Sequence, residues 1–157
     1  MKVGIVSLGC AKNLVDSEMI MGVLTAAGVM IVQDPAESDA IIVNTCGFIE
    51  SAKTESRQTI SEMVAYGKKL IVCGCYAQRY ADRLKAEVPG IDRIITVREY
   101  PRIGAILEDT FRRESLKFGQ LDFMNRYLAT SPVTPYLKLS DGCDNRCTYC
   151  AIPLIRG

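Results

Sequence analysis

Residues 39–45 read DAIIVNT, and the central run AIIV at residues 40–43 is apolar at every position. A strand with one wet face alternates apolar and polar side chains, so this unbroken run is typical of a parallel strand buried on both faces. Short apolar runs of the same kind occur at residues 2–8 and 69–73. Because parallel strands need long, usually helical, connections, the pattern predicts an α/β fold.

Helical patterns separate these runs. Apolar residues at helical spacing predict a helix over residues 14–27, with Asn13 as its N-cap and Gly28 as its left-handed stop. The same alternation continues, with strands expected over residues 29–33 and 92–97 and helices over 48–66, over 78–87 and from Pro101 onward. We therefore expect a parallel sheet with right-handed crossovers, flanked by helices.

The regular pattern stops at residue 112. Charges cluster from there to residue 135, and Ser131-Pro132 punctuates the stretch, so we interpret residues 112–135 as a linker. Residues 1–111 would form one domain before it. Residues 136–157 would begin a second domain, opening with a strand over residues 136–140.

The composition is that of a globular domain with one sizeable core, because 48% of the 157 residues are hydrophobic and 24% are charged. The 19 basic and 18 acidic residues are mixed along the chain, so no basic face indicates a nucleic-acid partner. No apolar stretch is long enough for a signal-peptide core or a membrane span. We expect a cytoplasmic protein without a membrane partner.

Seven cysteines and no histidine restrict the metal chemistry. Thiols stay reduced in the cytoplasm, so these cysteines are expected to be metal ligands or catalytic thiols rather than disulfides. Without imidazole ligands, a metal must be held mainly by thiolates, and such soft ligands favour zinc or iron–sulfur.

Three cysteines have the spacing C-x3-C-x2-C: Cys143, Cys147 and Cys150. Three thiolates on one loop can hold three irons of a four-iron cluster and leave the fourth iron free to bind another group. A zinc site would need a fourth thiolate or a histidine nearby, and residues 151–157 contain neither. An incidental group of reduced cysteines is the alternative.

Three further cysteines directly follow predicted strands, and each is adjacent to a glycine: Cys10, Cys46 and Cys75. Glycine allows the backbone to approach a bulky inorganic group closely. The carboxyl ends of parallel strands share one edge of the sheet, so we expect these thiols to meet there, although free cysteines can also simply pack in a core. Cys73 lies within an apolar run and is expected to fill the core.

The C-x3-C-x2-C spacing, with Tyr149 before its last cysteine, resembles the signature of the radical S-adenosylmethionine enzymes. Together with a second cysteine set in an N-terminal α/β domain, it resembles the methylthiotransferase family among them. Residues 6–18 (VSLGCAKNLVDSE) and 150–157 (CAIPLIRG) are similar to the branch that modifies a ribosomal protein. The transfer-RNA branch usually has Gln-Met-Asn where this chain has Ala11-Lys12-Asn13.

The resemblance implies two 4Fe-4S clusters, with the residues already singled out as their ligands. Cys143, Cys147 and Cys150 would hold the cluster that binds S-adenosylmethionine, with Tyr149 near the adenine or simply packed. The second cluster, on the other three cysteines, would bind or donate sulfur. One S-adenosylmethionine would supply a methyl group and another a 5′-deoxyadenosyl radical. The implied product is a methylthio group on the β-carbon of an aspartate in a small-subunit ribosomal protein; no further catalytic residue is identified.

Two alternatives stay open from the sequence. An enzyme of the same family could modify a transfer RNA, and a non-catalytic iron–sulfur or zinc module would hold a closed site that does not respond to S-adenosylmethionine. Residues 136–157 would be only the start of a radical S-adenosylmethionine barrel, a fold that needs about 200 residues or more. We therefore expect that these 157 residues alone do not form the barrel and are inactive.

Overall fold

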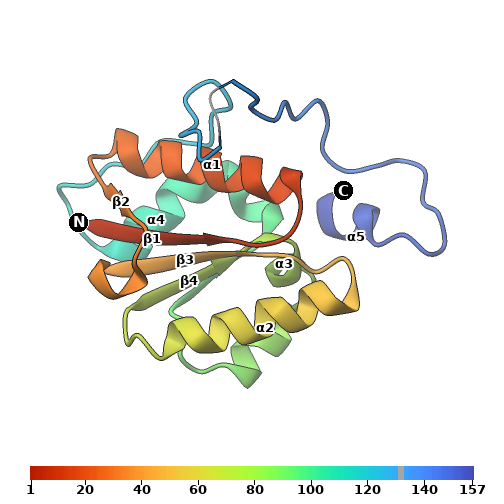
Figure 1. Ribbon diagram of the computed structural model, residues 1–157, viewed down its shortest axis with the longest axis horizontal. Coiled ribbons are helices and arrows are strands. Elements are labelled where there is room, and N and C mark those ends of the chain that lie inside the picture. The colour runs from red at the N-terminus through yellow and green to blue at the C-terminus, as the bar shows by residue number, and fades with distance from the viewer. Residues whose placement is uncertain (131–132) are drawn as a thin grey trace.

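The computed structural model, which describes residues 1–130 and 133–157, contains a five-stranded parallel sheet with helices on both faces (Figure 1). The strands are β1 (Lys2–Ser7), β2 (Met30–Val32), β3 (Ala40–Thr45), β4 (Lys69–Cys73) and β5 (Arg93–Ile95). Their order across the sheet is β2-β1-β3-β4-β5, and all four pairings are parallel. The expected α/β fold is confirmed.

Five α-helices and two short 3-10 helices complete the described residues: α1 (Ala11–Ala26), α2 (Glu50–Val64), α3 (Gly74–Glu87), α4 (Ile103–Phe111), α5 (Ile152–Arg156), η1 (Pro35–Glu37) and η2 (Val97–Arg102). Helices α1 and α4 pack on one face of the sheet, and α2 and α3 pack on the other (Figure 1). No helix in the described ranges is both long and apolar enough to cross a membrane.

The central strands β3 and β4 send alternate side chains into two separate cores. Ile42 and Ile71 pack in the core beneath α1 and α4, whereas Ile41 and Leu70 pack beneath α2 and α3. All four side chains are at most 2% exposed. Each such burial contributes roughly 1.5–3 kcal/mol to folding, which explains why the run has no polar position.

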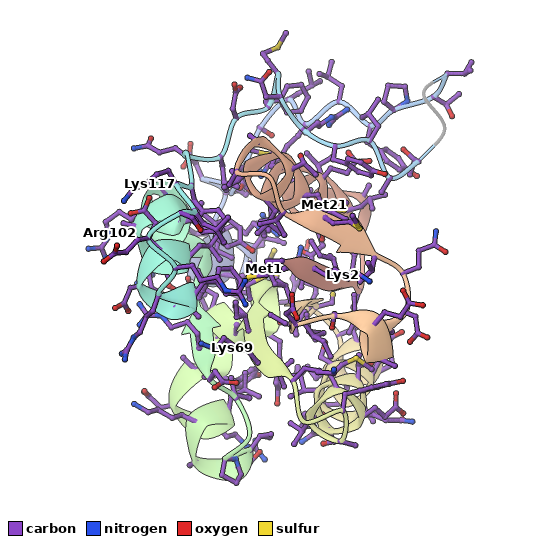
Figure 2. The ribbon with its side chains drawn as sticks, turned by 90° about the vertical axis from the view of Figure 1, so that its left-hand side faces the viewer. Met1, Lys2, Met21, Lys69, Arg102 and Lys117 are labelled. Atoms are coloured by element: carbon purple, nitrogen blue, oxygen red, sulfur yellow. The ribbon has the colours of Figure 1, made fainter. Side chains whose placement is uncertain are left out.

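The cysteine-bearing loops lie at only one end of the sheet, the carboxyl ends of the strands. Figure 2 looks onto the amino ends of the strands, where Lys2 and Lys69 are labelled. The carboxyl ends open on the opposite side, toward α5 (Figure 1). The cysteine-bearing loops lie at that second end.

Helix α3 begins earlier than expected. It starts at Gly74 rather than at residue 78, because Gly74 takes φ = +93° and turns β4 into the helix without a loop. Cys75 therefore lies in the first turn of α3. The helix is kinked at Tyr80, whose φ and ψ are −131° and 30°.

The expected role of Asn13 as an N-cap is wrong. Helix α1 begins at Ala11, with Cys10 in the capping position, so Asn13 is already inside its first turn. The side chain of Asn13 is fully buried and donates hydrogen bonds to the carbonyl oxygens of Leu8 (3.0 Å) and Thr45 (2.8 Å). Its amide therefore ties β1 to β3 instead of capping a helix.

The strand expected over residues 136–140 is also wrong. The segment is described and has no strand pairing, and it lies against the first turns of α1, whose backbone amides are already used within the helix. A strand needs a neighbouring strand to pair with, and none of the five strands in the described part of the chain pairs with this segment. Ser131 and Pro132, on which the linker interpretation partly rested, lie outside the described residues. Helix α5 was not expected.

Substitution of Gly74 tests whether the direct turn from β4 into α3 is needed. A Cβ at Gly74 would overlap Asn44 Oδ1 and lie 2.5 Å from Thr45 O, whereas a Cβ at Gly28 (φ = +78°) would meet nothing within 4 Å. Gly28→Ala should therefore cost about 1 kcal/mol from backbone strain. Gly74→Ala should cost at least about 2 kcal/mol more, measured by urea unfolding. Equal losses would contradict this arrangement.

Candidate functional site

The ends of β1, β3 and β4 lie level with one another. In the sheet Ser7 pairs with Asn44, and Asn44 pairs with Cys73. Each of the three candidate ligands follows one of these aligned positions within three residues: Cys10, Cys46 and Cys75. The strand order reverses between β1 and β3, which is where doubly wound sheets bind ligands. The sheet therefore carries all three cysteines to its ligand-binding edge.

The three cysteines line one cavity of about 820 Å³, together with Phe48 and Ile49 just before α2, residues of the first turns of α2, and Ile152 and Ile155 of α5. The loops that carry them pack directly against one another. A Cβ at Gly9 would lie only 2.7 Å from Cys46 Sγ, and one at Gly47 would lie 2.9 Å from the backbone nitrogen of Tyr76. Glycine at both positions permits these close approaches.

The donor set decides which metal group this cavity suits. Within residues 1–130 and 133–157, no three His, Cys, Asp or Glu side chains lie close enough together to hold a single ion. A four-iron cluster is wider than one ion, so its thiolate ligands stand further apart around it. Three thiols facing one roomy cavity, without imidazole, fit a four-iron cluster with one open iron.

Cys73 and Cys75 have different surroundings although they are two residues apart. Cys73 is fully buried in the core beneath α1 and α4, as expected, and burial raises the pKa of its thiol to about 12. Burial also raises the pKa of Cys75, but the Arg156 guanidinium acts in the opposite direction. Cys75 is thus a buried thiol with a cation beside it.

The second cysteine motif lines another cavity, of about 550 Å³: Cys143, Cys147 and Cys150 all border it. Arg146, between the first two, takes a left-handed conformation with φ = +43°. The backbone nitrogen of Cys143 donates to Gly157 O at 2.9 Å, which closes the loop onto the end of α5. Tyr149 is 91% exposed and does not border the cavity, so its expected place near the adenine stays a prediction.

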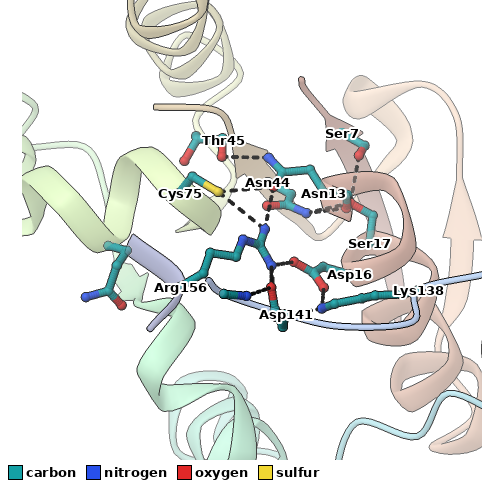
Figure 3. A network of polar contacts seen from close by, with 12 residues as sticks. Ser7, Asn13, Asp16, Ser17, Asn44, Thr45, Cys75, Lys138, Asp141 and Arg156 are labelled. Atoms are coloured by element: carbon teal, nitrogen blue, oxygen red, sulfur yellow. Dashed lines mark hydrogen bonds and ion pairs between the residues drawn. The ribbon is translucent and has the colours of Figure 1, made fainter. Parts of the chain in front are cut away.

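A buried cluster of charges connects the C-terminal segment to α1 (Figure 3). Asp16 of α1 is 1% exposed, and its carboxylate accepts from Lys138 Nζ at 2.8 Å and from Arg156 Nη1 at 2.6 Å. Asp141 joins the same two cations, at 2.8 Å from Lys138 and 3.3 Å from Arg156. We call these four residues the Asp16 cluster.

Within the Asp16 cluster, hydrogen bonds and opposite charges offset the cost of removing the charged groups from water. Burial alone would lower the pKa of Lys138, but its hydrogen bonds to Asp141 and Asp16 outweigh burial and raise the pKa above the ordinary value. Burial would likewise raise the pKa of Asp141, but Lys138 and Arg156 outweigh it and lower that pKa. Lys138 and Asp141 therefore both remain charged in the fold.

A second acidic residue of α1 holds an earlier part of the same segment. Glu18 is 1% exposed, and its carboxylate lies 3.6 Å from Arg126 Nε and accepts from the backbone nitrogen of Ala129 at 3.0 Å. A Cβ at Gly22 would overlap Asn125 O, so the segment lies directly on the helix. Residues 125–129 are thus fixed to α1 next to the Asp16 cluster.

The sequence pattern predicts the six cysteines as ligands but does not predict the residues that surround them. The sequence pattern indicates no site role for Asp16, Glu18 or Arg156. One signal was present: two carboxylates stand in a helix whose other residues after Leu14 are mostly apolar or small. Buried carboxylates need cationic partners, but nothing in the sequence indicates which of the 19 basic residues supplies them.

Comparison with known proteins gives consistent matches. Residues 2–96 match a family described as "Uncharacterized protein family UPF0004". The chain is 47% identical to the "Ribosomal protein uS12 methylthiotransferase RimO" of Acetivibrio thermocellus, over 99% of this chain and 38% of that protein. Proteins of the same name from Clostridioides difficile and Aquifex aeolicus are each 45% identical over 100% of this chain, and 38% and 34% of their lengths are covered. The chain thus spans little more than a third of these relatives.

Replacement of Asp16 tests whether the buried charges hold the segment. The side chains of Arg156 and Lys138 are only 2% and 14% exposed, and both contact the Asp16 carboxylate. Asp16→Asn removes that negative charge and leaves Asp141 as their remaining carboxylate partner. We expect a loss of about 3 kcal/mol in the free energy of unfolding, measured in urea. The matched control is Glu50→Gln, because Glu50 pairs with Lys53 on the surface with its side chain 74% exposed, and it should change little. Similar effects of the two variants would show that the Asp16 cluster is not structural.

Proposed function

The chain belongs to the family UPF0004, and we propose from this premise that it forms part of a radical S-adenosylmethionine methylthiotransferase that modifies ribosomal protein uS12. The proposed product carries a methylthio group on the β-carbon of an aspartate of that protein. The relatives named for this activity support the proposal, as they match nearly the whole chain. We place the enzyme in the cytoplasm, where its ribosomal substrate is made.

The observation that carries the proposal is the convergence of two separate cysteine sets on two cavities joined by α5. Residues of α5 line both cavities: Ile155 and Arg156 border the one with Cys75, and Pro153 and Leu154 border the one with Cys147. Enzymes that insert sulfur by a radical route need a radical source and a sulfur source near the same substrate carbon. Two adjacent thiolate sites meet that requirement.

We assign one 4Fe-4S cluster to each cysteine set. Cys10, Cys46 and Cys75 would hold the cluster that binds sulfur, and Cys143, Cys147 and Cys150 would hold the one that binds S-adenosylmethionine. With both bound, the clusters would supply the electron that cleaves S-adenosylmethionine to a radical and the sulfur for transfer. A radical route suits the reaction because the C–H bond at this β-carbon is not acidic enough for a protein base.

The protein side chains have supporting tasks in this scheme. The glycines beside Cys10 and Cys46 allow the cysteine-bearing loops to pack closely against one another. The Asp16 cluster fixes the segment that carries the second cysteine set. We propose residues 1–111 as the domain of the first cluster, 112–135 as a linker and 136–157 as the beginning of the radical domain.

Single cysteine variants of this chain test the first cluster. After anaerobic reconstitution with iron and sulfide, Cys10→Ala, Cys46→Ala and Cys75→Ala should each lose the iron of that cluster, measured as iron and sulfide per chain and as visible absorbance. Cys73→Ala is the matched control, because Cys73 is fully buried in the core and should leave the iron content unchanged. Full iron content in any one of the three variants would remove that cysteine from the ligand set.

An assay of the full-length enzyme tests the substrate. With S-adenosylmethionine and a strong reductant, ribosomal protein uS12 should gain the mass of one methylthio group at an aspartate, measured by mass spectrometry of its peptides. Transfer RNA serves as the competing substrate. Modification of transfer RNA alone would establish the other branch, and no cleavage of S-adenosylmethionine would indicate a non-catalytic module. The 157 residues alone should modify neither.

A further inference from the structure

Helix α5 forms the wall between the two cysteine cavities, and Arg156 lies at its end. Ile155 is 1% exposed and packs with Cys75 and Ala151 in a small apolar cluster of its own. This packing turns the adjacent Arg156 side chain into the N-terminal domain, where it is 2% exposed. A buried guanidinium at this place needs a partner for each of its donors.

The partners of Arg156 belong to both sides of the site (Figure 3). Nη1 donates to Asp16 at 2.6 Å and to Asp141 at 3.3 Å. Nη2 donates to Asn13 Oδ1 at 2.7 Å and to Cys75 Sγ at 3.3 Å. The planar guanidinium thus uses one nitrogen for the carboxylates and the other for the amide and the sulfur.

Cys75 differs from the other two cysteines of its set in the hydrogen bonding of its sulfur. Among residues 1–130 and 133–157, the sulfurs of Cys10 and Cys46 accept no side-chain hydrogen bond, whereas Cys75 Sγ accepts one from a cation. Hydrogen bonds to ligand sulfurs are one of the ways in which a protein sets the potential of an iron–sulfur cluster. A donor in a buried site acts strongly because little water screens it.

We propose that Arg156 is a positioning residue that links the two cysteine sites and, through its hydrogen bond to Cys75 Sγ, raises the reduction potential of the cluster held by Cys10, Cys46 and Cys75. This inference rests on the cluster assignment of the proposed function. Reduction adds negative charge to the cluster and its thiolates. A cationic donor stabilises that charge, so the reduced state gains more than the oxidised state and the potential rises.

Asp16 sets the position of this donor. Its carboxylate holds Nη1, and this fixes the plane of the guanidinium so that Nη2 faces Cys75. Loss of Asp16 should therefore weaken the sulfur contact without touching any cysteine. The effects of replacing Asp16 and Arg156 should not add, since both act through one hydrogen bond.

The test uses the full-length protein with Cys143, Cys147 and Cys150 replaced by alanine, so that only the first cluster remains. Its midpoint potential is measured by redox titration followed by electron paramagnetic resonance. Arg156→Gln should shift the potential to a more negative value, and Arg156→Lys, which keeps the charge but not the forked geometry, should shift it less. The double variant Asp16→Asn with Arg156→Gln should shift the potential no further in the negative direction than Arg156→Gln alone. Arg102→Gln is the matched control, because Arg102 is exposed on the surface (Figure 2) and should leave the potential unchanged.

The outcomes separate this inference from the proposed function. If the protein with native Arg156 takes up no cluster on Cys10, Cys46 and Cys75, the proposed function fails. If it takes up the cluster and Arg156→Gln leaves the potential unchanged, the role of Arg156 is overturned and the proposed function stands. If Arg156→Gln takes up no iron, Arg156→Lys decides: a negative shift supports the role, and no shift overturns it.

Discussion

The level ends of three parallel strands are the constraint on which the rest of the structure depends. Because Ser7, Asn44 and Cys73 are aligned across β1, β3 and β4, the residues that follow them leave the sheet at the same height. A slip of one residue in either pairing would turn every side chain of a strand to the other face and expose an apolar one. The packing of both cores therefore also fixes where Cys10, Cys46 and Cys75 lie.

The same edge is built from polar residues that a helix would ordinarily keep on its surface. Helix α1 buries Asn13, Asp16, Ser17 and Glu18. Asn44 donates to Ser17 Oγ at 2.9 Å, which ties this polar side of α1 to the end of β3. Such groups are costly to bury without partners, and the C-terminal segment supplies the cations. The fold thus couples the attachment of that segment to the integrity of the first cysteine site.

Local patterns in the sequence were enough for the sheet but not for the contacts around the site. The run of residues 40–43 predicted β3, and the position of Cys46 after it predicted the shared edge. The strand expected over residues 136–140 does not form, because the local pattern of apolar residues cannot show whether a neighbouring strand is present to pair with it. The pair Asp16–Arg156 joins residues 140 positions apart, and its existence follows from the packing of α5 rather than from any local pattern. Asn13 failed as an N-cap because its tertiary partners override the local preference.

The central claim is that thiols far apart in the chain hold one iron–sulfur cluster at the carboxyl edge of the sheet. Anomalous diffraction at the iron edge, from crystals of the anaerobically reconstituted protein, locates iron without reference to sequence or activity. We expect an iron peak in the cavity bordered by Cys10, Cys46 and Cys75, within bonding distance of all three sulfurs. An empty cavity beside an occupied C-x3-C-x2-C loop, or iron bound to Cys73, would contradict the claim.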